Sequence, residues 1–135
     1  MGKHDNLIRL RLKLDNAITY GTKKEALCIA RIGLAKAKKR RFIGEVEYFK
    51  GQADLINNRF VSAIEHFDKA IAHNPYDGAA YNDKALCLAE LGLIDEALVY
   101  FNKDIEVESD YATIYHNKGW LLNNIGQYTQ AIDRK

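Results

Sequence analysis

Proline is nearly absent from this chain, whose 135 residues include one proline and nine glycines. A sandwich or barrel of many short strands needs a turn about every ten residues, so this scarcity excludes such a fold. Apolar residues make up 47% and charged residues 28% of the sequence, close to globular averages, which excludes disorder and fibrous repeats. We therefore expect a single folded domain built from long helices.

Cysteines and long apolar runs are also scarce. The two cysteines, Cys28 and Cys87, have no partner at the spacing of a metal site or redox motif, so we expect small buried side chains of a reduced, cytoplasmic protein. No uninterrupted apolar stretch approaches the about 20 residues of a membrane span, and Arg9 and Arg11 would interrupt the apolar core of a secretory signal. The sequence predicts no membrane partner.

Few residues are arranged for chemistry. The four histidines, His4, His66, His73 and His116, show no metal-ligand spacing, and no serine, histidine and acid arrangement indicates a nucleophile. Glycines occur singly, so no phosphate-binding loop is present. We expect the histidines to be solvated helix residues. The sequence predicts no catalytic residue, no metal and no cofactor, and hence a protein that is not an enzyme.

The net charge of +2 hides a strong asymmetry along the chain. Residues 1–43 contain 12 basic and 3 acidic side chains, whereas residues 44–135 contain 8 basic and 15 acidic ones. The densest basic run comprises Lys36, Lys38, Lys39, Arg40 and Arg41. Near the C-terminal end of a helix these cations interact favourably with the helix dipole and increase solubility. The functional alternative is that they bind an anionic partner. Without interleaved aromatic residues or a recognition-helix motif, nucleic acid is disfavoured.

A repeat of 34 residues organises the chain. Shifting the sequence by 34 aligns Gly51 with Ala85 and Gly119, Ala63 with Ala97 and Ala131, Phe67 with Phe101, and Tyr81 with Tyr115. Apolar residues within a unit recur at helical spacing and predict one helix from about Ala79 to Leu91 and a second ending at about Val107. Gly92 suits the left-handed end of the first helix, and Asn74-Pro75 stops the corresponding second helix of the preceding unit.

These motifs resemble the tetratricopeptide repeat, unit by unit. The match covers 44–77, 78–111 and the partial unit 112–135, and residues 7–43 resemble a divergent first helix pair in which Glu25-Ala26-Leu27 corresponds to Glu96-Ala97-Leu98. The resemblance implies an all-α, right-handed superhelix of antiparallel helix pairs. Asp54 and Asp104 depart from the pattern at places that the other units fill with apolar or small residues. We expect each to be partly exposed or paired with a nearby lysine.

The resemblance also implies a concave groove lined by the first helix of each unit. Its predicted peptide-binding or partner-binding residues are Tyr48, Gln52, Asn82, Leu86, His116, Trp120 and Asn123. Amides can hold a peptide backbone while side chains rest on the aromatic rings. Trp120 is the predicted binding hot spot, and the alternative is that it seals the open end of the last unit.

Chaperone-binding members of the family grip a C-terminal carboxylate with Lys, Asn and Arg on successive first helices. The corresponding positions here are Tyr48, Gln52, Asp83, Thr113 and Asn117 in one register, or Arg11, Asp15, Phe49, Ala79 and Asp83 in the other. Neither register reproduces the set, and Asp83 would repel a carboxylate. The sequence therefore predicts no recognition of chaperone tails by this means.

We thus expect a non-enzymatic module that binds a protein or peptide in its groove. The alternative is a scaffold that forms homo-oligomers through its uncapped C-terminal end or by pairing basic and acidic halves. The chain stops eight residues into the helix expected from Tyr128, so we expect either a fragment or an open end that is covered by a partner or a second copy.

Overall fold

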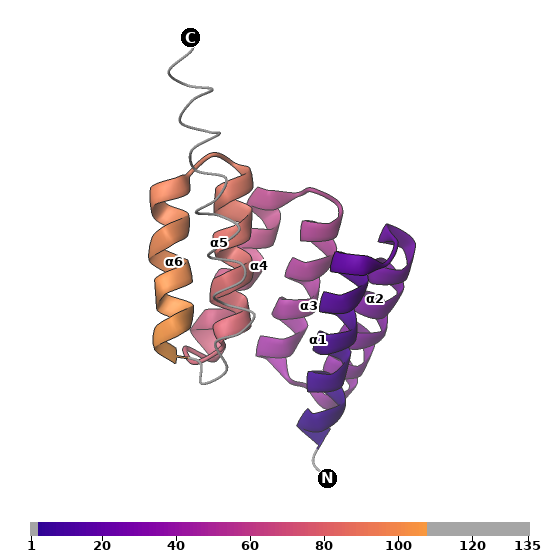
Figure 1. The fold of residues 1–135 in the computed structure, drawn as a ribbon. Helices are drawn as coiled ribbons and strands as arrows, with labels where there is room; N and C mark the ends of the chain where they lie inside the picture. Colours follow the sequence, from indigo (N-terminus) through magenta and orange to yellow (C-terminus); the bar gives the residue numbers. More distant parts are fainter. Residues whose placement is uncertain (1–2, 108–135) are drawn as a thin grey trace. The chain divides into compact units, whose positions relative to one another are not determined.

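A computed structural model of the chain describes residues 3–107, which form helices joined by short turns (Figure 1). The helices are α1 (Lys3–Tyr20), α2 (Lys23–Arg40), α3 (Ile43–Ile56), α4 (Phe60–His73), α5 (Gly78–Glu90) and α6 (Ile94–Val107). Over this range no strand is present, which confirms the all-α class. The expected partial unit 112–135 lies outside the described residues.

Local chemistry explains where the helices begin and end. Thr22 caps α2 by accepting a hydrogen bond from the Glu25 amide at 3.1 Å, and Asp77 caps α5 by accepting one from the Ala80 amide at 3.2 Å. After α5 the chain turns through Gly92 at φ 82°, a left-handed conformation that costs glycine little. Pro75 follows the end of α4, as the sequence predicted.

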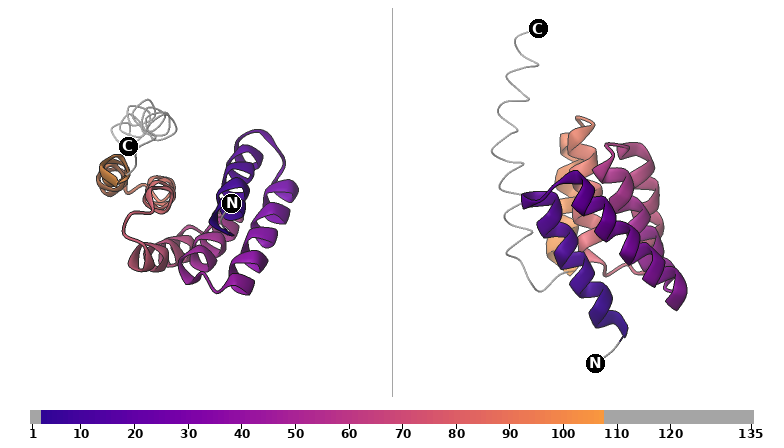
Figure 2. Two further views of the ribbon diagram at one scale, coloured as in Figure 1. Left: turned by 90° about the horizontal axis from the view of Figure 1, so that it is seen from below. Right: turned by 90° about the vertical axis from the view of Figure 1, so that its right-hand side faces the viewer.

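The chain divides into two compact units between Pro75 and Tyr76. In the first unit, consecutive helices pack side by side in antiparallel pairs, so α2 contacts both α1 and α3, and α3 contacts α4 (Figure 2). The buried face of α1 is lined mainly by leucines, whereas that of α2 carries only small residues. These residues are Leu7, Leu10, Leu14 and Ala17 in α1, and Ala26, Ala30, Gly33 and Ala37 in α2.

Two glycines allow close helix packing in this first unit. A side-chain carbon added to Gly51 would lie 2.6 Å from a ring carbon of Phe67, so the ring of α4 lies directly on the backbone of α3. The same construction at Gly33 reaches the Phe49 ring at 2.3 Å, which places α3 on α2. The 34-residue repeat aligns both Gly51 and Phe67 with residues of the next unit, whereas Phe49 is not among the aligned residues. Each ring is fully buried.

The second unit repeats this arrangement with α5 and α6. Ala85 of α5 and Ala97 and Phe101 of α6 are fully buried. The rings of Tyr81 and Tyr100 stack at 6.5 Å with 17° between their planes, and the Lys84 ammonium lies 3.9 Å from the centre of the Tyr100 ring. The two helices of this unit therefore share both apolar and cation–π contacts.

Three expectations about single residues can be compared with the structure. Cys87 is buried as predicted, but Cys28 is exposed, because it lies on the outer face of α2 between the buried residues Ala26 and Ala30. Asp104 is also buried, so the partial exposure considered for it is wrong.

In residues 3–107, no helix combines the length and the apolar character that crossing a bilayer requires.

Candidate functional site

The best-defined polar cluster of the first unit joins α1 to α3. Arg11 Nε donates a hydrogen bond to Glu45 Oε2 at 3.1 Å, and Arg11 Nη2 donates one to Oε1 at 2.8 Å. The guanidinium carbon lies 3.5 Å from the centre of the Tyr48 ring. Bidentate guanidinium–carboxylate bonds have a defined geometry and are stronger than neutral hydrogen bonds. Glu45 therefore holds the Arg11 guanidinium over the face of the Tyr48 ring.

Tyr48 and Gln52, two of the predicted groove residues, are buried in the structure. Beneath Arg11 the Tyr48 ring meets Phe49 edge-on at 5.3 Å and Phe67 at 6.2 Å. Tyr48 thus contributes to the core of the first unit. A ligand would contact its ring only after Arg11 moved aside, so contact between Tyr48 and a ligand stays a prediction.

The other predicted groove residues lie in the second unit or beyond it. Asn82 is buried in α5, and Leu86 is half-buried in the same helix. Asn82 Nδ2 donates to Asp83 Oδ1 at 3.4 Å, so Asn82 carries a side-chain hydrogen bond within its own helix. His116, Trp120 and Asn123 lie outside the described residues.

The structure adds an exposed face of α1, which is not among the groove residues predicted from the sequence. Ile8, Leu12 and Ile18 of this helix are 53%, 60% and 42% exposed. A signal for this face was present: the register that aligns Ala26 with Ala63 places Arg11 and Asp15 at the positions of Tyr48 and Gln52. The first helix of the chain therefore presents apolar side chains to solvent beside a fixed ion pair.

Asp15 is the acidic group of this face. Desolvation raises the pKa of the Asp15 carboxyl from 3.8 to about 6, and the positive charge of Arg11 opposes the shift. Because the side chain still contacts solvent, screening limits the effect of this shift on stability.

We expect the Asp15 carboxyl to titrate with a midpoint near pH 6 in the native protein. Between pH 4 and 6 the native carboxyl then binds a proton that the unfolded chain releases, so the contribution of Asp15 to stability falls as pH rises through this window. The carboxyl carbon can be followed by NMR, with Arg11→Gln raising the midpoint further. A midpoint at or below 4 would contradict the assignment.

A second polar cluster lies on the α3–α4 pair and centres on His66. His66 Nδ1 lies 2.7 Å from Glu47 Oε2, and its Nε2 lies 3.6 Å from Asp54 Oδ2. Asp54 also accepts a hydrogen bond from Ser62 at 2.5 Å and faces Arg59 at 4.0 Å. The expectation of a solvated His66 is wrong, because two carboxylates of α3 flank its ring. The expected pairing of Asp54 is present, with Ser62, His66 and Arg59 in place of a lysine.

The predicted basic run forms the C-terminal end of α2. Lys38, Lys39 and Arg40 make the last turn, and Arg41 is the C-cap at φ 59°. The Arg41 amide donates to the Lys38 carbonyl, and the Phe42 amide donates to the Ala37 carbonyl. Cations at this end interact favourably with the helix dipole, which supports the structural interpretation. Four side chains of the run, those of Lys36, Lys39, Arg40 and Arg41, also line one cavity.

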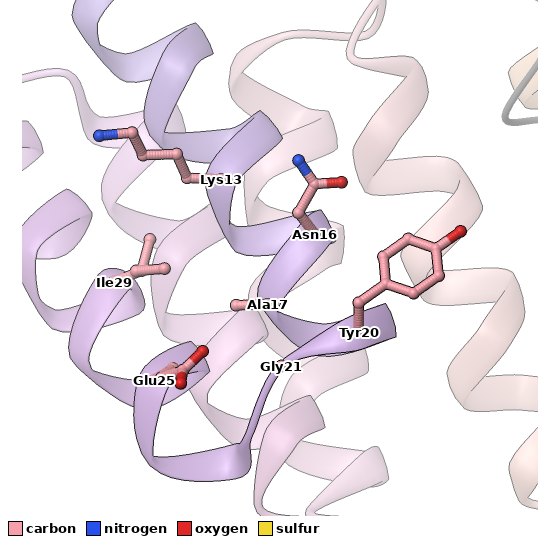
Figure 3. Close-up of a pocket in the computed structure, with 7 residues that line it drawn as sticks. All are labelled: Lys13, Asn16, Ala17, Tyr20, Gly21, Glu25 and Ile29. Atoms are coloured by element: carbon pink, nitrogen blue, oxygen red, sulfur yellow. The ribbon is translucent and has the colours of Figure 1, made fainter.

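A different cavity of about 390 Å³ lies in the crease where α1 turns into α2 (Figure 3). Its lining is mixed: Lys13, Asn16, Ala17, Tyr20, Gly21, Glu25 and Ile29. One acid and one base among mainly neutral groups define no particular ligand. Within residues 3–107, no group of three histidine, cysteine or acidic side chains is placed to hold a metal ion.

Comparison with known proteins places the repeats in a family. A family model described as a tetratricopeptide repeat matches residues 54–117, and a second model of the same description matches residues 112–133. Together the two matches span more than half of the chain.

Curated relatives with partial similarity carry related names. The Hsp70-Hsp90 organizing protein 3 of Arabidopsis thaliana is 31% identical over 91 residues, covering 67% of this chain and 16% of that protein. The Hsp70-Hsp90 organizing protein 1 of Glycine max is 30% identical over 108 residues, covering 73% of this chain and 18% of that protein. This chain thus spans less than a fifth of the length of these two relatives. On the repeat matches and the helix pairs described above, the chain belongs to the tetratricopeptide repeat family.

Proposed function

We propose that this chain is a non-enzymatic protein-interaction module that binds a segment of a partner protein on the first helices of its repeats. The observation that carries the proposal is the exposed apolar face of α1 in a chain built from tetratricopeptide repeats. Binding here means burial of apolar surface and pairing of polar groups, without a chemical step.

The first unit has the features of a preorganised binding surface. Ile8, Leu12 and Ile18 offer apolar surface, and burying it on a partner is favourable by about 25 cal/mol per Å². Because Glu45 already fixes Arg11, the Arg11 side chain loses little freedom when a partner contacts this ion pair. Asp15 adds an acceptor on the same helix. We therefore expect a peptide with apolar side chains and at least one basic group.

The names of the relatives make a chaperone one candidate partner. In the register that aligns Arg11 with the lysine of the chaperone-binding members, the Arg11 guanidinium is already bound by Glu45. The remaining positions hold Asp15, Phe49, Ala79 and Asp83, of which two are acidic. A free C-terminal carboxylate would meet repulsion at both. We propose that any chaperone contact uses an internal segment and not the carboxylate of the tail.

Replacing Leu12 with glutamate should weaken binding of partner peptides about tenfold, because a charge would replace an exposed apolar contact at the centre of the α1 face. The probe is a displayed library of random 12-residue peptides, selected on the immobilised full chain. Affinities of the selected peptides are then measured by fluorescence anisotropy for the wild type and the variant.

Val61→Glu is the matched control, since Val61 is 62% exposed, close to the 60% of Leu12, but lies on the second helix of its pair. We expect this control to change affinity less than twofold. Amidating the C-terminus of the selected peptides should have a similarly small effect. Equal losses in the two variants would remove the α1 face from the site, and a strong requirement for the free carboxylate would support tail recognition instead.

The alternative function, self-association through the C-terminal end, concerns residues outside the described range and stays a prediction. Pairing of the basic and acidic halves would weaken strongly as salt is raised, whereas binding through apolar burial would change little.

A further inference from the structure

We propose that the end of α2 is a second binding site, separate from the α1 face, which takes an acidic peptide segment of a partner protein. A cavity of about 410 Å³ opens there, and Lys36, Lys39, Arg40 and Arg41 line it. All four lining residues carry a positive charge. The site goes beyond the proposed function because it lies on a second helix and recognises charge.

The helical spacing explains why these four cations gather while a fifth does not. Lys36, Lys39 and Arg40 stand at i, i+3 and i+4, which places them on one face of the helix. The left-handed cap at Arg41 turns the chain and brings its side chain to the same cavity. Lys38 belongs to the same turn and is exposed, but it does not line the cavity.

The charges of this site are only partly satisfied within the described protein. Across residues 3–107, no acidic side chain forms an ion pair with Lys36, Lys39 or Arg41. The C-terminal dipole of α2 attracts these cations to the helix end, but they repel one another at i, i+3 and i+4. An anion in the cavity would relieve this repulsion, and the guanidinium of Arg41 suits two-bond contact with a carboxylate.

The dimensions favour an acidic peptide. Lys36 and Arg40 are separated by about 6 Å along the helix axis, at 1.5 Å per residue. Alternate residues of an extended chain lie about 6.6 Å apart on the same side, so two carboxylates at such positions match the two ends of the site. The cavity is several times larger than one water-sized group, which leaves room for two carboxylates and the backbone between them.

The same features disfavour nucleic acid. Proteins that bind nucleic acid combine many phosphate contacts, often six to ten, with aromatic rings on which bases stack when the strand is single. The cavity offers four cations over little more than one helical turn, and its lining contains no aromatic residue. Its local, compact charge fits a short acidic segment.

The test uses a fluorescein-labelled 12-residue peptide of alternating glutamate and serine, titrated with the full chain at 50 mM salt. The Lys36→Gln/Lys39→Gln variant should weaken binding about tenfold, and raising the salt to 300 mM should weaken wild-type binding further. The matched control is Lys24→Gln/Lys38→Gln, which removes the same charge from exposed positions of the same helix outside the cavity. We expect the control to change affinity less than threefold.

Equal losses in the two double variants would overturn the proposal, because binding would then follow net charge alone. A thymidine oligonucleotide of equal charge that binds as tightly as the peptide would also overturn it, in favour of nucleic acid. Inorganic phosphate that displaces the peptide at equal concentration would show a site for single ions and would contradict the size argument. Self-association of the wild type that the Lys36→Gln/Lys39→Gln variant loses, without peptide binding, would identify a second copy as the occupant and exclude the proposed one.

Discussion

Phe67→Ala should lower the free energy of unfolding by about 3–5 kcal/mol, the range for truncating a fully buried phenylalanine. The Phe67 ring fills the space between α3 and α4, against the backbone of Gly51 and the ring of Tyr48. Gly51 has no side chain that could move into the vacated volume, so the cavity would persist. Urea denaturation followed by circular dichroism measures the loss.

Val61→Ala is the control for this substitution, because Val61 lies on the same helix and is exposed. Its loss of apolar volume occurs in solvent and should change stability by no more than about 0.5 kcal/mol. A loss below about 1 kcal/mol for Phe67→Ala would mean that the pair is held by contacts other than this ring.

Gly33→Leu should cost about 3 kcal/mol, at the upper end of the range for overpacking a core. Even a single added carbon at this position would lie 2.3 Å from the buried Phe49 ring, so α2 and α3 would have to separate. The effect acts against helix propensity, since replacing glycine with leucine inside a helix is otherwise favourable. A loss of stability in this variant would therefore come from the packing of α2 on α3 and not from the helix propensity of the new residue.

Ala35→Leu inserts the same side chain on the exposed face of the same helix and should be nearly neutral. The double variant Gly33→Leu/Phe49→Ala restores volume to the site, and its loss should be smaller than the sum of the two single losses by at least about 1 kcal/mol. Additive losses would show that Gly33 and Phe49 do not share one packing site.

The sequence predicted the bounds of α5 and the ends of α4 and α6 closely, because these ends depend on local chemistry. The first helix of the complete unit was expected over Ala79–Leu91 and occupies Gly78–Glu90. Its end follows from the left-handed turn at Gly92, and that of α4 from Pro75. These features belong to residues near each other in the chain, which is why the pattern alone was sufficient.

Side-chain contacts between helices were less accessible to sequence reasoning. The family resemblance implied that Tyr48 lines a groove, but the long side chain of Arg11, from the preceding helix pair, reaches over its ring and bonds to Glu45. His66 was expected in solvent, and Glu47 and Asp54 enclose it from the neighbouring helix. Both arrangements depend on how far a flexible side chain extends, which spacing along the sequence does not encode.

The central claim is that partner segments bind on the first helix of each repeat. Its most direct test is a titration of the ¹⁵N-labelled full chain with a peptide selected from the displayed library, followed by amide chemical shifts. We expect the largest changes in α1, whose apolar face is exposed, and smaller changes in α3 and α5, with little change in α4 and α6. Changes confined to α4 and α6, the second helices of their pairs, would contradict the claim.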